Sequence, residues 1–404
     1  MTPRVRRREL AAVLLALPWP FLAALLHAGG WPWLLQQVDL DVYLAAADRL
    51  AAGQPLYFDP PGRLPMIYPP FAAVLTLPLA AAGPGAAYLI WPLLNAALAA
   101  AVFARIGLRA APALIVAAVA IALGGPLAQV FFLGQVGIFL MALCVLDLAP
   151  GPTLLARAGR WLPFGVPDRL LPAGVLTGVA AAIKLTPALF VVALVLVGRR
   201  RPALVAVLSA AGATMIGFAV RPAESAGYWA RIATGNFPGE PDAPYQVTNQ
   251  SLLAIAVRFL RTPELPLWLT VLLGGAVVAL TLLAAVVVAR AGEPMLALLL
   301  VGLGSTVAAP ISWTHAYTWL APIAVLALLR PLPGWLRLLA VGYWGWATWE
   351  PFQDLNVDTE VGLRLGAGGQ LATAVGPLLG VALLAGCWWW ARSRTASRTP
   401  ARIR

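Results

Sequence analysis

The polar side chains that are able to do chemistry stand at a few places in an otherwise apolar chain. Asp39 and Asp41 form an Asp-x-Asp pair in a stretch rich in proline and tyrosine. A partly buried carboxylate can act as a general base when a partner positions it. Residues at i and i+2 lie on different faces of a helix, so we expect only one of the two acids to face a cavity. A solvated pair or a helix cap is the alternative.

Two other groups are suited to binding an anion. Lys184, the one lysine of the chain, separates two short apolar runs, where Thr186 can cap and Pro187 can begin a second helix. A cation beside a helix N-terminus favours an anion such as phosphate, and snorkelling of the lysine is the alternative. His315, in PISWTH, can orient a carboxylate, donate to a phosphate or satisfy a buried backbone group.

Two further polar segments interrupt apolar sequence. FLGQVGIF places the amide of Gln135 within or at the mouth of an apolar run, where the amide needs a partner. VTNQSL follows a loop rich in proline and glycine, with Ser251 as the expected helix cap; a polar loop without a special role is the alternative. The two histidines and two cysteines lack the spacing of metal ligands, so we predict no metal site.

The composition places these groups in a membrane protein. The 404 residues are 61% hydrophobic and 11% charged, with a mean hydropathy of +0.83. Apolar runs of about 17–25 residues, the length of a transmembrane helix, recur along the chain. We predict a single all-α membrane domain over 1–404, whose first helix is retained rather than cleaved as a secretory signal. About 12 transmembrane helices are predicted, at about 10–28, 84–104, 110–126, 127–149, 171–183, 186–198, 202–220, 266–289, 294–310, 316–329, 332–348 and 370–391.

The arginines predict the orientation. With these spans, 20 arginines fall on the side of the termini and 7 on the other side. The excess predicts a plasma-membrane protein with both termini, including the basic tail 392–404, in the cytoplasm. The net charge of +12 follows from this orientation, and we expect no nucleic-acid partner. Three long loops then face outward: about 29–83, 221–265 and 349–369.

Short helices are expected within the first of these loops. Asp41–Ala52 has apolar residues at helical spacing and is closed by Gly53, which predicts an amphipathic surface helix. The apolar segment 72–83 is too short to span a bilayer at about 1.5 Å per residue. It is expected to lie at the interface or to be re-entrant.

The order of these motifs resembles one family. Asp39-x-x-x-Tyr43, Gly53-x-x-x-Tyr57 and Tyr68-Pro-Pro70 are followed by Gly134-Gln135, Lys184-x-x-Pro187, Asn249-Gln250-Ser251 and Pro310-Ile-Ser-Trp-x-His315. This series resembles glycosyltransferase family 87, the C-type (GT-C) membrane family of polyprenyl-phosphate-mannose-dependent α-mannosyltransferases of actinobacteria. The chain departs from the family pattern at Ala316, where a second histidine often stands.

The resemblance implies an inverting transfer of mannose from polyprenyl-phosphate mannose to a hydroxyl of a membrane glycolipid or lipoglycan. It also implies an α-1,2 linkage and an active site on the outer face. The catalytic carboxylate of the family corresponds to Asp39, and His315 is assigned a catalytic role beside it. We predict that the donor and its phosphate contact Lys184, Arg63, Tyr68 and Gln135. The predicted acceptor contacts are Asp41, Tyr43, Tyr57, Asn249, Gln250 and Trp313.

Other functions are compatible with the same residues. A lipid-linked arabinofuranosyltransferase has the same architecture, and the first-loop motifs do not separate the two sugars. A flippase or transporter of lipid-linked sugars is expected to have polar residues at mid-membrane depth and two related halves, whereas the polar groups here collect near one face. For the transferase we expect no cofactor and a monomer, with the lipid-linked donor, the glycolipid acceptor and membrane lipids as partners.

Overall fold

The computed structural model describes residues 37–58, 64–159, 167–234, 242–355, 358 and 360–398. Within these ranges the chain is helical, and β pairing is limited to one isolated bridge between Asn249 and Trp313. The prediction of an all-α protein is confirmed for this part of the chain. The first predicted crossing, 10–28, lies outside the described residues.

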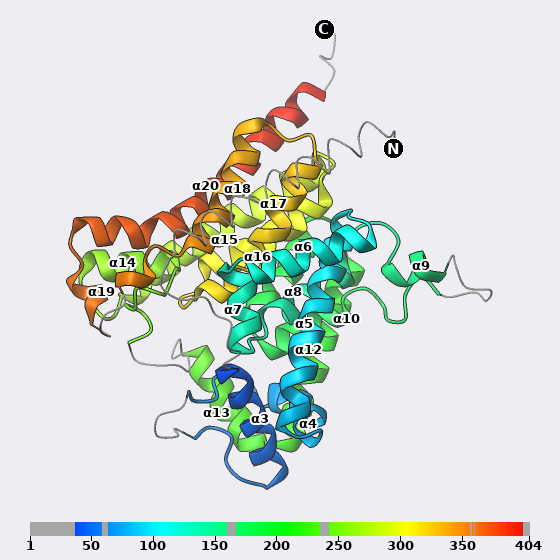
Figure 1. Ribbon diagram of the computed structural model, residues 1–404, viewed down its shortest axis with the longest axis vertical. Coiled ribbons are helices and arrows are strands. Elements are labelled where there is room, and N and C mark those ends of the chain that lie inside the picture. Colours follow the sequence, from blue (N-terminus) through cyan, green and yellow to red (C-terminus); the bar gives the residue numbers. More distant parts are fainter. Residues whose placement is uncertain are drawn as a thin grey trace.

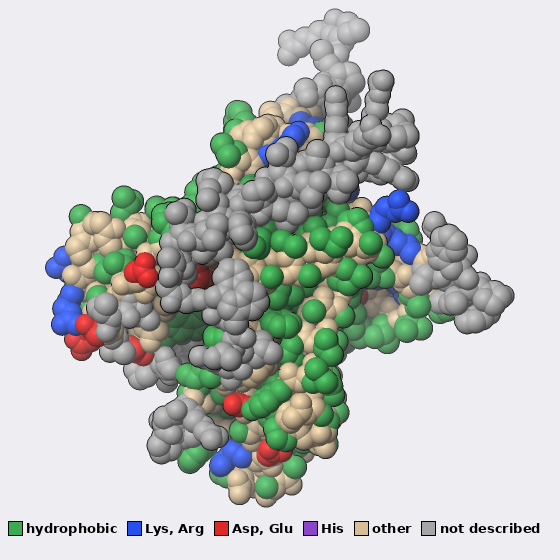
Figure 2. Space-filling view, in the orientation of Figure 1, with side chains coloured by type: hydrophobic (Ala, Val, Ile, Leu, Met, Phe, Trp, Pro, Cys, Tyr) green, Lys and Arg blue, Asp and Glu red, His purple; other side chains and the backbone are tan. Residues whose placement is uncertain are grey.

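Four of the described helices are long and apolar enough to cross a membrane. They are α5 (Pro84–Ile106), α12 (Arg200–Val220), α15 (Leu267–Arg290) and α20 (Ala367–Arg398). Each coincides with a predicted crossing. Large apolar side chains such as Leu93, Leu208 and Leu272 are exposed on them, and hydrophobic side chains cover much of the face shown in Figure 2. The protein is therefore a membrane protein, because so much exposed apolar surface is stable only in lipid.

A fifth apolar unit is bent where two straight crossings were expected over 110–126 and 127–149. Helices α6 (Ala110–Ala122) and α7 (Gly125–Leu133) meet at 78°, and α8 (Gly137–Leu148) follows. Gly124 and Gly125 have φ values of 98° and 73°, which other residues rarely adopt. Pro126 then stands in the first turn of α7, where its missing N–H has no cost. These residues break the apolar sequence into three shorter helices.

The remaining elements are shorter. They are α3 (Val38–Ala51), α4 (Pro70–Ala81), α9 (Leu154–Gly159), α10 (Val175–Ile183), η1 (Thr186–Ala188), α11 (Leu189–Leu196), α13 (Pro222–Ala233), α14 (Leu252–Leu260), α16 (Pro294–Ala308), η2 (Thr314–Tyr317), α17 (Leu320–Leu329), α18 (Gly334–Trp349), η3 (Gln353–Leu355) and α19 (Val361–Arg364). The predicted surface helix is α3, and the predicted break at Lys184 separates α10 from η1. Thr186 makes no capping bond, whereas Ser251 caps α14 as expected.

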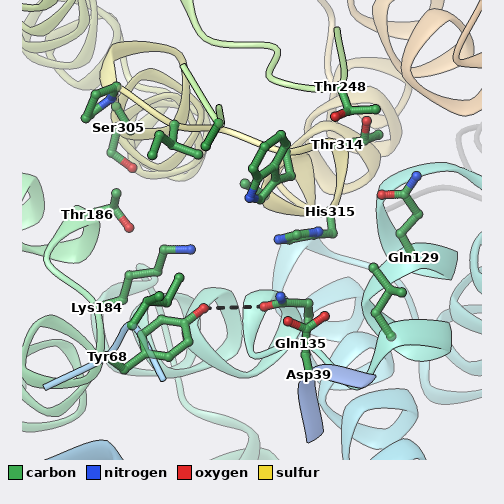
Figure 3. Close-up of a pocket in the computed structure, with 18 of the residues that line it drawn as sticks. Asp39, Tyr68, Gln129, Gln135, Lys184, Thr186, Thr248, Ser305, Thr314 and His315 are labelled. Atoms are coloured by element: carbon green, nitrogen blue, oxygen red, sulfur yellow. Dashed lines mark hydrogen bonds between the residues drawn. The ribbon is translucent and has the colours of Figure 1, made fainter. Parts of the chain in front are cut away.

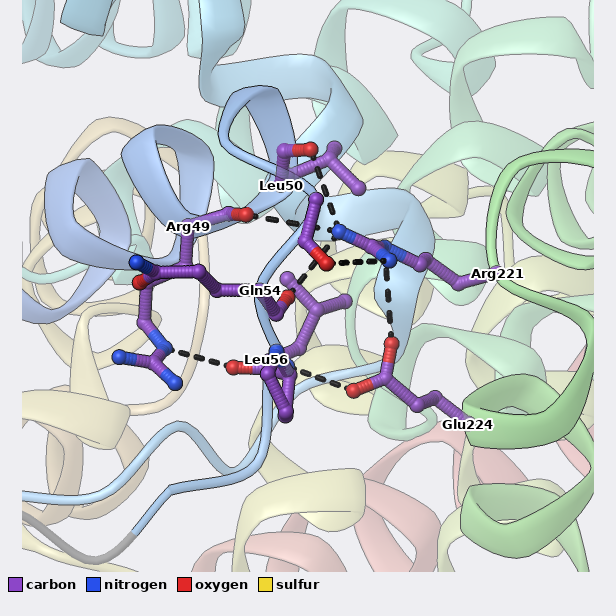
Figure 4. Close-up of polar contacts among 8 residues, drawn as sticks. Arg49, Leu50, Gln54, Leu56, Arg221 and Glu224 are labelled. Atoms are coloured by element: carbon purple, nitrogen blue, oxygen red, sulfur yellow. Dashed lines mark hydrogen bonds and ion pairs between the residues drawn. The ribbon is translucent and has the colours of Figure 1, made fainter.

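Helices α3, α4 and α13 group at one end of the helical body, at the bottom of Figure 1. The contact between α13 and the segment after α3 is polar (Figure 4). The Arg221 guanidinium donates to the carbonyl oxygens of Leu50 and Gln54 at 3.2 and 3.0 Å. The Glu224 carboxylate accepts from the backbone N–H of Leu56 at 2.6 Å. The segments predicted as the first two outer loops are thus joined to each other.

At another place, a buried carboxylate joins α8 to α10. Asp147, which is 3% exposed, accepts hydrogen bonds from the N–H groups of Gly174 and Thr177 and from the Thr177 hydroxyl, at 2.7–2.9 Å. These N–H groups belong to the first turn of α10, where a carboxylate also interacts favourably with the helix dipole. Asp147 therefore acts as a cap supplied by a different helix.

Candidate active site

A cavity of about 1150 Å³ opens between α3, α7, the Lys184 break and η2 (Figure 3). Its volume exceeds the roughly 300–1,000 Å³ of a typical small-molecule site. Among the residues that the structure describes, the charged side chains that line it are Asp39, Lys184 and Glu350. The predicted site residues that line it as well are Tyr43, Tyr68, Gln135, Trp313 and His315. The structure therefore brings together seven residues predicted from five separate motifs.

The first turn of α3, which carries Asp39, is fixed against the end of α7. The Gln37 N–H donates to the carbonyl oxygen of Phe132 at 3.0 Å, and its side-chain amide donates to that of Phe131 at 2.8 Å. Gly134 has a φ of 77°, and a Cβ at this position would lie 2.6 Å from the Cβ of Leu40. The glycine of the Gly-Gln motif thus permits the close approach that places Asp39 beside the glutamine.

The Gln135 amide joins the polar groups at this end of the cavity. Its oxygen accepts from the Tyr43 hydroxyl at 3.1 Å and from the Tyr68 hydroxyl at 3.4 Å. Its side chain lies beside the Asp39 carboxylate in Figure 3. Burial raises the pKa of Asp39 to about 6, against the opposing effects of the neighbouring Gln135 amide and of the positive charge of Lys184. A carboxylate with such a pKa is a stronger base than an ordinary aspartate.

Lys184 and His315 face the same space. The Lys184 Nζ lies 5.6 Å from the centroid of the Tyr68 ring, and the ion pairs of the described residues do not include this lysine. Burial, reinforced by the charge of Lys184, lowers the pKa of His315 to about 3. The imidazole is therefore neutral at physiological pH and has one N–H to donate and one nitrogen to accept. In Figure 3 its ring lies between Gln135 and the upper wall of the cavity.

The predicted acceptor residues Asn249 and Gln250 are buried and do not line the cavity. The Asn249 side chain accepts from the N–H of Ser312 at 3.0 Å and donates to the carbonyl oxygen of Pro310 at 3.2 Å. The Gln250 N–H donates to the carbonyl oxygen of Ser312 at 2.8 Å. The Asn-Gln-Ser motif therefore holds in place the loop that carries His315.

Two other predicted residues, Asp41 and Tyr57, do not line the cavity. Asp41 accepts a hydrogen bond from the Tyr88 hydroxyl. Tyr57 donates to the carbonyl oxygen of Tyr68 at 2.9 Å, and its ring stacks on that of Tyr228. These contacts make Tyr57 a support for the wall residue Tyr68. Arg63 lies outside the described residues.

Comparison with known proteins gives the family. The sequence model of glycosyltransferase family 87 matches residues 66–312, which is more than half of the chain. The chain belongs to glycosyltransferase family 87. It is 32% identical, over 74% of its own length and 71% of the relative, to a polyprenol-phosphate-mannose-dependent alpha-(1-2)-phosphatidylinositol mannoside mannosyltransferase of Mycobacterium tuberculosis. It is also 32% identical to a polyprenol-phosphate-mannose-dependent alpha-(1-2)-phosphatidylinositol pentamannoside mannosyltransferase of Mycolicibacterium smegmatis, over 81% of its own length and 79% of the relative. No solved structure matches the chain.

This family 87 glycosyltransferase also has polar cavity residues that the sequence motifs did not reveal. Glu350 follows the last turn of α18, and the side chains of Gln129 and Gln353 donate to its carboxylate. Gln246 and Thr248 line the cavity next to the Asn-Gln-Ser motif. An acid directly after the apolar, tryptophan-rich run WGWATW was the one available signal for Glu350. Its partner Gln129 is 221 residues away in the chain and leaves no spacing to detect, whereas Gln353 follows Glu350 by only three residues.

Proposed function

We propose that this enzyme transfers mannose from a polyprenyl phosphate to a hydroxyl of a phosphatidylinositol mannoside, forming an α-1,2 linkage with inversion. The supporting observation is that Asp39, Lys184 and His315 face one cavity. The proposal also uses the donor and acceptor named for the relatives from Mycobacterium tuberculosis and Mycolicibacterium smegmatis.

In the proposed reaction, Asp39 accepts the proton of the acceptor hydroxyl while the oxygen attacks the anomeric carbon of the donor. A bond forms between this carbon and the acceptor oxygen, and the bond to the phosphate oxygen breaks in line with it. Polyprenyl phosphate leaves with the bonding electrons, and the charge of Lys184 stabilises the new negative charge. Neutral His315 donates a hydrogen bond to the same phosphate. We propose that this reaction does not need a metal ion.

The apolar part of the cavity wall supports a lipid donor. Leu185 and Val192 line the cavity and are also exposed on the surface of the protein. A polyprenyl chain leaving the phosphate beside Lys184 therefore has an apolar route toward the lipid. This arrangement also supports a hydrophobic donor over a water-soluble nucleotide sugar.

The proposal includes the orientation inferred from the arginines. About 12 crossings place both termini in the cytoplasm and the cavity on the outer face of the plasma membrane, with the enzyme active as a monomer. Labelling of single cysteines introduced at 221–234 should occur from outside the cell, and exclusive labelling from inside would contradict the orientation.

A direct assay tests the reaction. Purified enzyme should transfer label from polyprenyl-phosphate mannose, and not from polyprenyl-phosphate arabinose, to phosphatidylinositol mannosides in detergent. An α-1,2-specific mannosidase should release the label from the product. Transfer from the arabinose donor alone would show that the enzyme transfers arabinose and not mannose. A product that resists the mannosidase would contradict the α-1,2 linkage.

A further inference from the structure

The cavity has a second polar end, built around a carboxylate with no role in the reaction just described. Glu350 is 6% exposed and lines the cavity. The Gln129 amide donates to both of its carboxylate oxygens at 2.7 Å, and the Gln353 amide donates to one of them at 3.0 Å. The ion pairs within the described ranges do not involve Glu350. The group is therefore held by two neutral amides and has no compensating cation among these residues.

The backbone around Glu350 is arranged to keep it in the wall. Glu350 has φ 51° and ψ 52°, which is the left-handed helical conformation. Residues other than glycine rarely adopt it, and those that do are often found at functional sites. Gly125, with φ 73°, lies so close to α18 that an added Cβ would be 2.7 Å from the Thr348 hydroxyl. This close approach brings α7, and with it Gln129, to the end of α18. If Glu350 only ended helix α18, it would not need the hydrogen bonds from the Gln129 amide.

The chemistry of this end differs from that of the Lys184 end. In Figure 3, Lys184 and Gln129 lie on opposite sides of the view, with Asp39 and His315 between them. A phosphate is attracted to the lysine, whereas the described residues around Glu350 supply no cation, so the donor phosphate is favoured at the Lys184 end. A carboxylate flanked by amides suits neutral groups that both donate and accept hydrogen bonds. Adjacent hydroxyls of a sugar are such groups.

We propose that Glu350, Gln129 and Gln353 form a subsite that binds hydroxyls of the acceptor sugar and so helps to select the acceptor. This proposal rests on the proposed function, because it assumes that Asp39 activates an acceptor held in the same cavity. Burial raises the pKa of Glu350 to about 8, so the group can also donate a hydrogen bond at neutral pH. The cavity, larger than a typical small-molecule site, has room for donor and acceptor groups together.

The test compares Glu350→Gln with Asp354→Asn, an acid-to-amide change at an exposed position nearby. With polyprenyl-phosphate mannose as donor and a phosphatidylinositol mannoside as acceptor, Glu350→Gln should raise the acceptor KM about tenfold. The donor KM should stay unchanged, and Asp354→Asn should behave as wild type. An unchanged acceptor KM, or an equal rise of the donor KM, would overturn the subsite.

Acceptors that lack one mannose hydroxyl sharpen the test. Removal of the hydroxyl bound by Glu350 should raise the KM of the wild-type enzyme but should cause little further loss in Glu350→Ala, which has no polar group to make that bond. If every deoxy acceptor affects both enzymes equally, the subsite is wrong. Asp39→Asn provides the separation from the proposed function: if it keeps normal turnover, the mechanism fails whatever Glu350 does. If Asp39→Asn loses turnover while Glu350→Gln keeps the wild-type acceptor KM, the mechanism stands and the subsite fails.

Discussion

Two carboxylates of this protein, Asp147 and Asp39, stand in opposite kinds of surroundings. Asp147 is enclosed and accepts hydrogen bonds from Gly174 and Thr177 on both of its oxygens. Asp39 faces a large cavity, with the Gln135 amide as its neighbour and a pKa raised to about 6. A fully bonded carboxylate stabilises a fold, whereas one with free acceptor positions and a raised pKa is able to take a proton from a substrate. The two carboxylates therefore differ mainly in how many hydrogen bonds they accept, and less in how deeply they are buried.

The largest effect is expected for Asp39→Asn. The amide keeps the size of the side chain but does not accept a proton, so the rate of transfer should fall by about 10²–10⁴-fold. Binding of polyprenyl-phosphate mannose should remain near normal, since Asp39 acts on the acceptor. Turnover and donor binding measured in the same detergent check both statements. Loss of donor binding together with turnover would instead indicate a damaged cavity.

Asp147→Asn should show the opposite pattern. The amide NH₂ would face one of the N–H groups of α10, and the charge that strengthens the remaining bonds is lost. Stability should fall by about 1.5–3 kcal/mol, while turnover per folded molecule should stay near that of wild type. Thermal unfolding in detergent measures the first quantity, with the exposed Asp354→Asn as control. If Asp147→Asn kept the wild-type melting temperature but lost turnover, Asp147 would have a functional and not a structural role.

The anion-binding side of the cavity is tested by Lys184→Ala. The loss of a charge-assisted hydrogen bond to the donor phosphate should weaken donor binding by about 1.5–3 kcal/mol. Lys184→Arg keeps the charge and should recover part of the affinity. Donor titration of both variants provides the measurement. Equal donor affinity of the alanine variant and wild type would assign Lys184 a structural role.

The pH profile follows from the pKa of Asp39. Asp39 must be ionised to accept a proton, so kcat/KM should be highest above about pH 6 and should fall about tenfold per unit below it. The charge of Lys184 lowers this pKa, so the acidic limb of Lys184→Ala should move to higher pH. A shift to lower pH, or no acidic limb in wild type, would contradict the assignment of the base.

The sequence predicted the elements that composition and spacing determine. Long apolar runs predicted α5, α12, α15 and α20, and the motif order predicted that the residues around Asp39 would meet. The bend between α6 and α7 was missed, because two glycines in left-handed conformations do not change hydropathy.

The sequence did not predict where the side chain of a motif residue turns away from the cavity. Asn249 and Gln250 were assigned to the acceptor, but their hydrogen bonds hold the loop that carries His315. Glu350 was missed because its partner Gln129 is 221 residues away in the chain. Motif spacing identifies which segments meet, whereas the direction of each side chain depends on contacts between distant residues.

The smallest effect is expected for Asp41→Asn, which is the closest control for Asp39→Asn. Both residues belong to the first turn of α3, but Asp41 accepts a hydrogen bond from the Tyr88 hydroxyl and does not line the cavity. An asparagine oxygen is able to accept the same bond. The change in activation free energy should therefore stay within about 0.5 kcal/mol, which is about twofold in turnover. Loss of turnover in Asp41→Asn with near-normal turnover in Asp39→Asn would move the base to Asp41. Near-normal turnover in both would remove the carboxylate from the mechanism, because no other acid lies in this turn of the helix.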